Sequence, residues 1–197
     1  VNSFDTVCHE HLSYYGMRQI KYIMDTVGLT IIDFEFNDVN GGSVSVVVSP
    51  SGKECTTKLT ALLASELEQE LDTVKPWEEF ASRMTDNNHK FVKIVRDLRE
   101  EGYKVAGLGA STKGNVTLQT WGITPNDILA IGDVNPDKDG SFAPGTWIPI
   151  KNEDEVLAYY DVFVILPWHF KKFFVNNEKF KGKKLIFPLP TPEVVVP

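Results

Sequence analysis

The sequence has few cysteines and no long hydrophobic run, and each absence excludes a class of protein. Its two cysteines, Cys8 and Cys55, are too few for a disulfide framework in 197 residues and form no Cys-x-x-Cys pair for zinc. No stretch approaches the roughly eighteen consecutive apolar residues of a transmembrane helix, so we expect no membrane span. The first residues resemble no signal peptide, and we expect a cytoplasmic protein.

Basic residues are also fewer than acidic ones. The chain carries 20 Lys and Arg residues against 27 Asp and Glu residues, which gives a net charge of −7. Because a negative field repels polyanions, we expect no nucleic acid as a partner. A local group of backbone amides could still hold one phosphorylated metabolite.

An initial methionine is absent, and the first residues have the pattern of a domain interior. Residues 29–37 and 43–49 are β-rich and are separated by an Asn-Gly-Gly turn, which predicts an antiparallel hairpin. A hairpin is marginally stable by itself, so these strands need a larger sheet. We therefore expect the chain to be a fragment of a longer protein.

Helical patterns flank the hairpin. Residues 12–28 place apolar side chains on one helical face, and Gly28 is typical of the position just after a helix. Residues 56–101 repeat leucines at three- and four-residue spacing, are interrupted at Lys75-Pro76 and end before Gly102. We expect this second segment to be a helical arm.

From Tyr103 onward, short apolar segments alternate with helical ones. The expected elements are strands at 104–109, 128–133, 161–166 and 184–189, and helices at 112–121, 153–159 and 169–178. This alternation is typical of a parallel sheet covered on both faces. The predicted fold class is α/β: a Rossmann-like parallel sheet with flanking helices, preceded by a helical arm and a β-hairpin.

The loop after the first of these strands is a candidate anion site. It reads Gly-Leu-Gly-Ala-Ser-Thr-Lys-Gly-Asn over residues 107–115, and it combines flexible glycines with a helix N-terminus. It is not a Walker A loop, because Asn115 follows Gly114, and Thr112 occupies the third glycine position of a Gly-x-Gly-x-x-Gly loop. We expect it to bind a phosphate or diphosphate; the alternative is a tight turn in which Ser or Thr only caps the helix.

Other polar and aromatic side chains follow the second and third strands. Ligands of open α/β sheets bind at the carboxyl ends of the strands, where an acid can contact a ribose and a ring can stack on a base or sugar. Turn formation and packing are the alternative roles. The candidate substrate-binding residues are Ser111, Thr112, Lys113, Gly114, Asn115, Asp133, Trp168 and His169.

The densest polar cluster is Cys8-His9-Glu10-His11. Adjacent residues do not share a helical face, and neither HExxH nor HxxEH is present, so we expect no metal site. A histidine beside a carboxylate is consistent with a general base, because histidine titrates near neutral pH. Spacing alone does not rank that role above a hydrogen-bonded structural histidine.

Several segments together are more specific than any one motif. They are Phe4-Asp-Thr-Val-Cys-His-Glu-His-Leu-Ser-Tyr-Tyr15, Asn40-Gly-Gly-Ser43, Gly109-Ala-Ser-Thr-Lys-Gly-Asn115, Asn135-Pro-Asp-Lys138, Pro144-Gly-Thr146 with Ile148-Pro-Ile150, and Leu166-Pro-Trp-His169. In this order the sequence resembles the C-terminal part of the sugar C-methyltransferases over nearly its whole length. Those enzymes use S-adenosylmethionine and act on nucleotide-linked deoxysugars.

The resemblance implies a domain organisation. Residues 1–50 would be the C-terminal end of the S-adenosylmethionine-dependent methyltransferase domain, 51–102 a helical linker and 103–197 a Rossmann-like sugar-nucleotide-binding domain. The S-adenosylmethionine site would lie mostly upstream of this chain, so we expect the fragment to be inactive alone.

The resemblance also implies a mechanism. A base removes the proton next to the ketone of a dTDP-type keto-deoxysugar, and the enolate attacks the methyl group of S-adenosylmethionine. His11 matches the base and Glu10 the adjacent carboxylate, while the loop of Gly114 would hold the diphosphate. This sequence has Cys8 where relatives often have a tyrosine and Ser45 where many have an arginine.

Two alternative functions stay open from the sequence. The departures at Cys8 and Ser45 are compatible with a non-catalytic nucleotide-sugar-binding or regulatory module. The glycine-containing loop together with Asp133 is compatible with an NAD(P)-binding Rossmann domain.

Overall fold

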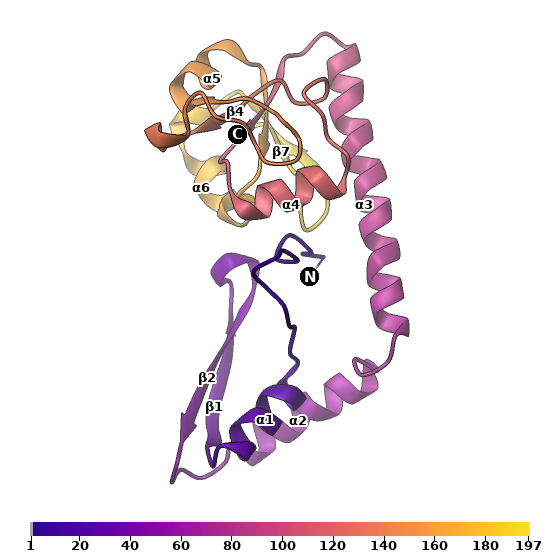
Figure 1. The fold of residues 1–197 in the computed structure, drawn as a ribbon, viewed down its shortest axis with the longest axis vertical. Helices are drawn as coiled ribbons and strands as arrows, with labels where there is room; N and C mark the ends of the chain where they lie inside the picture. Colours follow the sequence, from indigo (N-terminus) through magenta and orange to yellow (C-terminus); the bar gives the residue numbers. More distant parts are fainter. Residues whose placement is uncertain (1) are drawn as a thin grey trace. The chain divides into compact units, whose positions relative to one another are not determined.

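A six-stranded sheet organises the C-terminal half of the chain in the computed structural model, which describes residues 2–197 (Figure 1). The strand order is β5-β4-β3-β6-β7-β8. Five neighbouring strands are parallel and β8 pairs antiparallel with β7. The strands are β3 (Val105–Leu108), β4 (Ile131–Asp133), β5 (Ile150–Asn152), β6 (Val162–Ile165), β7 (Lys184–Phe187) and β8 (Glu193–Val195).

Helices cover both faces of this sheet. Figure 1 shows α3 and α4 on one side of it and α5 and α6 on the other. The chain runs from β3 through α4 toward one edge of the sheet and through α5 and α6 toward the other, and right-handed crossovers in opposite directions place their helices on opposite faces. The bounds are α3 (Lys75–Glu100), α4 (Thr112–Thr120), α5 (Glu153–Tyr159) and α6 (Lys171–Asn176), with short 3₁₀ helices η2 (Pro136–Lys138), η3 (Trp168–Phe170) and η4 (Glu178–Phe180).

The central strands form the core because their sequences are apolar without interruption. All four residues of β3 and all four of β6 are buried, so neither face of these strands meets solvent. From α3, Phe91 and Val95 are completely buried, and the Phe91 ring packs 5.0 Å from that of Trp121 at the end of α4. The predicted α/β class with a parallel sheet is confirmed.

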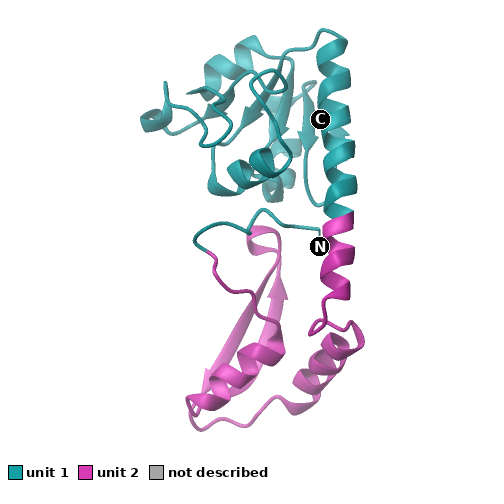
Figure 2. Ribbon diagram, turned by 45° about the vertical axis from the view of Figure 1, so that its right-hand side comes forward, with its two compact units in different colours: residues 1–10, 83–197 teal, residues 11–82 magenta. Residues whose placement is uncertain are grey.

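The chain divides into two compact units, residues 1–10 with 83–197 and residues 11–82 (Figure 2). The second unit holds α1 (Met17–Thr26), β1 (Thr30–Asn37), η1 (Val39–Gly41), β2 (Ser43–Ser49), α2 (Thr56–Glu68) and the start of α3. Its β1 and β2 form the predicted antiparallel hairpin, in register from Asn37 opposite Ser43. Its core consists of Met17, Ile31, Phe34 and Leu59.

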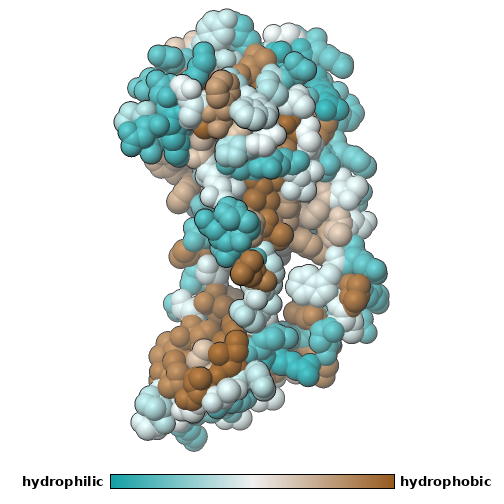
Figure 3. All heavy atoms as spheres, viewed as in Figure 1, coloured by the Kyte–Doolittle hydropathy of each residue, from teal (hydrophilic) through white to brown (hydrophobic). Residues whose placement is uncertain are grey.

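Apolar side chains also gather on the outside of this hairpin. Figure 3 shows an apolar surface over β1 and β2, where Phe36 and Val47 are at least half exposed. The two-stranded sheet leaves the outer edges of both strands without a neighbouring strand among residues 2–197. An edge of this kind can accept another strand.

Some predicted boundaries differ from the observed ones. The helix predicted from residue 12 begins only at Met17, after residues 11–16, which are not helical; Gly28 ends it with φ of +73° as expected. The helix predicted at 169–178 is split into η3, α6 and η4. Strands β5 and β8 were not predicted, because three residues are too few to show a period.

Within residues 2–197, no helix combines the length and the apolar composition that crossing a membrane requires.

Candidate functional site

The loop after β3 and the turn after β6 approach each other closely. Gly109 has φ of +82°, and a Cβ atom there would lie 2.8 Å from Cδ of Pro167. A Cβ atom on Gly114 would lie 2.9 Å from Cβ of Leu166. Glycine is therefore required at both positions. The contact lies at the switch point of the sheet, since the chain continues from β3 to β4 on one side and reaches β6 on the other.

Ser111 begins α4 as its N-cap. Its hydroxyl oxygen accepts the backbone N–H of Gly114 at 3.1 Å, and the hydroxyl hydrogen can still be donated elsewhere. Ser111 therefore does cap the helix, which was the alternative to anion binding. The cap still leaves the N-terminus of α4, which attracts anions, at the carboxyl edge of the sheet. Thr112 is exposed here, and Lys113 and Asn115 are partly buried.

Asp133 lies at the carboxyl end of β4 and is buried. Its Oδ1 accepts the backbone N–H of Asn135 at 2.9 Å, and its Oδ2 accepts the Lys138 ammonium at 3.0 Å. The same ammonium donates to the carbonyl oxygen of Ala110, in the loop before α4, at 2.7 Å. Sequence reasoning did not single out Lys138; its place in the Asn-Pro-Asp-Lys segment after a strand was the available signal.

Trp168 follows β6 and is bound to a residue from the beginning of the chain. Its indole N–H donates to Oδ2 of Asp5 at 2.8 Å, and the hydroxyl of Ser3 donates to Oδ1 at 2.7 Å. Both Asp5 and Trp168 are buried. The Trp168 ring therefore contributes mainly packing. Asp5 belongs to the same N-terminal motif as Glu10, and its bond to Trp168 attaches that motif to the edge of the sheet. The sequence carried no signal for this pairing.

His169 is partly buried beside these groups. Burial lowers its pKa below the usual 6.5, the positive charge of Lys113 lowers it further, and the negative charge of Asp5 acts in the opposite direction. Its Nδ1 atom is inaccessible to solvent and has no hydrogen-bond partner among residues 2–197. The structure thus brings Lys113, His169 and Trp168 together with Asp5 at one edge of the sheet.

The proposed base and its neighbour are on the surface. Glu10 ends the first segment of one unit and His11 begins the other, and both side chains are exposed. Oε1 of Glu10 lies 3.9 Å from Nε2 of His9. In the part of the chain that the structure describes, no three His, Cys, Asp or Glu side chains gather as metal ligands would.

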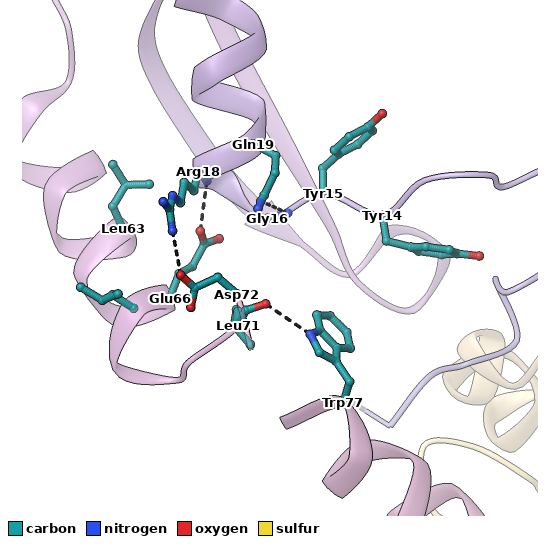
Figure 4. A pocket seen from close by; sticks show the side chains of 11 residues that line it. Tyr14, Tyr15, Gly16, Arg18, Gln19, Leu63, Glu66, Leu71, Asp72 and Trp77 are labelled. Atoms are coloured by element: carbon teal, nitrogen blue, oxygen red, sulfur yellow. Dashed lines mark hydrogen bonds and ion pairs between the residues drawn. The ribbon is translucent and has the colours of Figure 1, made fainter. Parts of the chain in front are cut away.

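Residues 11–82 enclose a separate cavity of about 550 Å³ (Figure 4). Glu66 caps α1 by accepting the N–H groups of Met17 at 2.6 Å and Arg18 at 3.1 Å, and Arg18 pairs with Asp72 at 2.9 Å. These charged groups are thus bonded within the cavity wall. The other lining residues are mostly apolar or aromatic, namely Tyr14, Tyr15, Gly16, Gln19, Leu63, Leu67, Leu71 and Trp77. None of the candidate substrate-binding residues lines this cavity.

Comparison with known proteins agrees with the motif order. Residues 38–190 match the family model described as "C-methyltransferase C-terminal domain". The chain belongs to this family. It is 31% identical over 200 residues to the C-methyltransferase NovU of Streptomyces niveus, with 98% of this chain and 48% of NovU covered. The chain therefore spans about half the length of that relative.

The family to which the chain belongs is that of the C-terminal domain of C-methyltransferases, and the matched relative is described as a C-methyltransferase. The resemblance to the C-terminal part of a sugar C-methyltransferase, read from the motifs, is confirmed at the level of the family. The roles of individual residues remain predictions.

Proposed function

We propose that the chain is the C-terminal part of an S-adenosylmethionine-dependent C-methyltransferase that acts on a nucleotide-linked, dTDP-type keto-deoxysugar. One observation supports the substrate class most directly. At the switch point of the sheet, the first turn of α4 carries Lys113, and the loop before it, which glycines hold against the turn after β6, accepts a hydrogen bond from the Lys138 ammonium. Helix N-termini and ammonium groups suit the diphosphate of a sugar nucleotide.

The proposed substrate-binding group is the set at this sheet edge. The N-terminal amides of α4 and the Ser111 hydroxyl donate to the diphosphate, and Lys113 contributes charge. His169 adds a polar group on the β6 side. The residues predicted for this set are Ser111, Thr112, Lys113, Gly114, Asn115, Asp133, Trp168 and His169; of these, Asp133 and Trp168 are bonded within the chain, to Lys138 and Asp5.

His11 is the proposed base. Its neutral imidazole accepts the proton from the carbon next to the sugar ketone; the electron pair of that C–H bond passes into the enolate. Glu10 is the proposed adjacent carboxylate, as the resemblance to the family implies. Cys8 cannot reach as far as a tyrosine, so we expect it to replace none of the functions of a tyrosine hydroxyl.

The methyl donor is proposed to bind mainly to other parts of the full-length protein. Within residues 11–82, the strand-to-helix turn between β2 and α2 contains one glycine, Gly52, which packs against the Ile32 side chain. It does not fit the glycine-rich loop that approaches an adenosine cofactor. We propose residues 1–50 as the end of the donor-binding domain, 51–102 as the linker and 103–197 as the sugar-nucleotide domain.

Ligand-dependent thermal unfolding tests the substrate class. We expect dTDP at about a hundred times its Kd to stabilise the chain by about 2.7 kcal/mol, and NADH to leave it unchanged. Stabilisation by NADH and none by dTDP would instead indicate a dinucleotide-binding domain.

Hydrogen exchange at the sugar tests the base. In the full-length protein, we expect His11→Ala to abolish exchange of the proton next to the ketone with deuterated solvent, whereas the matched variant His9→Ala retains it. Undiminished exchange in His11→Ala would remove His11 from the mechanism.

A further inference from the structure

The Asp133 carboxylate is already engaged within the chain. One oxygen accepts a backbone N–H and the other an ammonium group, and the residue is only 7% exposed. An acid that binds the pentose of a nucleotide at the end of the second strand needs an accessible oxygen for a sugar hydroxyl group. Asp133 has its bonds directed instead toward the segment that follows it, residues 135–138.

The Lys138 ammonium is the accessible group of this arrangement. It donates two hydrogen bonds, to Asp133 and to the Ala110 carbonyl, and an ammonium carries three N–H groups. The Lys138 side chain is 39% exposed, and these two bonds leave its third N–H unused. These bonds hold it at the loop that begins α4.

Short-range contacts hold the backbone of Lys138 as well. The Asn135 side chain accepts the N–H of Asp137 at 3.0 Å and so caps η2, and the Ser141 hydroxyl donates to the carbonyl oxygen of Lys138. The lysine is therefore presented from a fixed turn, which lowers the entropy that a ligand contact would cost.

We propose that Lys138 binds the diphosphate of the substrate and that Asp133 is a positioning residue, which holds the ammonium at the loop and does not bind the pentose of the nucleotide. This inference rests on the proposed function. Lys113 interacts with His169, which follows β6. Lys138 pairs with Asp133, at the end of β4. The diphosphate of a sugar nucleotide carries two negative charges, which the two lysines complement, one in the first turn of α4 and the other bonded to the loop before it.

Calorimetric titration of the 197-residue chain with inorganic pyrophosphate and with dTDP tests the proposal. We expect Lys138→Met to weaken both ligands about tenfold and equally, because it removes a charge-assisted hydrogen bond to the group they share. Lys138→Arg keeps the charge and should lose less than Lys138→Met. The control Lys90→Met changes an exposed lysine of α3 and should bind as the wild type does.

Asp133→Asn separates the two roles of the acid. If Asp133 only positions and neutralises Lys138, this variant changes the affinities for pyrophosphate and dTDP by the same factor. If Asp133 binds the deoxyribose, the affinity for dTDP falls while that for pyrophosphate does not, and the positioning role is overturned.

The remaining outcomes distinguish this inference from the proposed function. A wild-type chain that binds neither ligand overturns both. A wild-type chain that binds both ligands, with Lys138→Met binding them equally well, overturns the role of Lys138 and leaves the anion site in place. Thermal unfolding of each unliganded variant verifies that it is folded, and Lys138→Arg provides the comparison if Lys138→Met is not.

Discussion

At Gly109 and Gly114, the loop after β3 touches the turn after β6 so closely that no side chain fits between them. The nearest atoms belong to Pro167 and Leu166, and both lie under 3 Å from where a Cβ atom would be. This contact brings the N-terminus of α4 beside Trp168 and His169. The candidate site can therefore form because Gly109 and Gly114 have a hydrogen atom where other residues have a Cβ atom.

Gly109→Ala and Gly140→Ala separate close packing from backbone strain. Both glycines have positive φ, +82° and +77°, but a Cβ atom on Gly140 would meet nothing within 4 Å. We expect Gly140→Ala to lower the free energy of unfolding by about 1 kcal/mol through strain alone. Gly109→Ala should cost about 1–3 kcal/mol more, because its methyl group overlaps Pro167. Equal losses in urea denaturation would contradict the close contact.

His169 should make stability depend on pH. Its pKa in the folded chain lies below 6.5, so the unfolded chain binds the proton more readily. The contribution of the neutral side chain is complete above pH 6.5 and is lost as the pH falls toward the folded-state value. Between about pH 5 and 7, we expect His169→Gln to show a flatter dependence of unfolding free energy on pH than the wild type. Identical slopes for the two proteins would rule out this effect.

At the scale of elements, the C-terminal part of α3 is fastened to the sheet unit by a buried face and by polar bonds. Phe91 and Val95 are buried, the Asn87 side-chain amide donates to the carbonyl oxygen of Pro190 at 2.9 Å, and Arg96 pairs with Asp127 at 2.9 Å. Burial raises the pKa of Asp127, but bonds from Arg96 and Thr124 outweigh burial and hold that pKa below 3.8. The ionised carboxylate therefore stabilises the folded unit.

Two charge-removing variants on α3 test this attachment. We expect Arg96→Met to destabilise the chain by about 1–2 kcal/mol, because it leaves a buried carboxylate without its cation. Lys93→Met removes the exposed pair with Asp97 from the same helix and should cost under about 0.5 kcal/mol. The stabilisation is present above pH 3.8 and is lost as the pH falls through the lowered pKa, so the Arg96→Met deficit should shrink in acid. Equal deficits for the two variants at neutral pH would argue against this attachment.

At the scale of the whole molecule, the candidate binding residues belong to one unit. Residues 111–115, 133, 168 and 169 all lie in the unit of residues 1–10 and 83–197, whereas residues 11–82 hold the hairpin and the separate cavity. A ligand that these residues bind at the sheet edge therefore contacts the unit of residues 1–10 and 83–197.

Hydrogen exchange measured by mass spectrometry can detect that division. With dTDP at about a hundred times its Kd, amides of β3 and β6 that exchange by global opening should exchange about a hundredfold more slowly. We expect amides of β1 and β2 to be unaffected. Equal protection of the hairpin would show that the two units unfold together.

Local patterns in the sequence determined most of the fold. The uninterrupted apolar segments that became β3 and β6, the Asn-Gly-Gly turn of the hairpin and Gly28 at the end of α1 were all identified from neighbouring residues. Strands β5 and β8 were missed because each has three residues and is stabilised by pairing with a neighbouring strand, β4 and β7 respectively.

The candidate site divides in the same way. Anion binding at the N-terminus of α4 was predicted from the glycines of the loop and from Ser111, and it stays a prediction. Only the tertiary structure decided that Lys138 reaches Ala110, 28 residues away, and that Trp168 reaches Asp5, 163 residues away. Glycine, capping and strand preferences act over a few residues, whereas these polar side chains are paired by the order of the strands in the sheet.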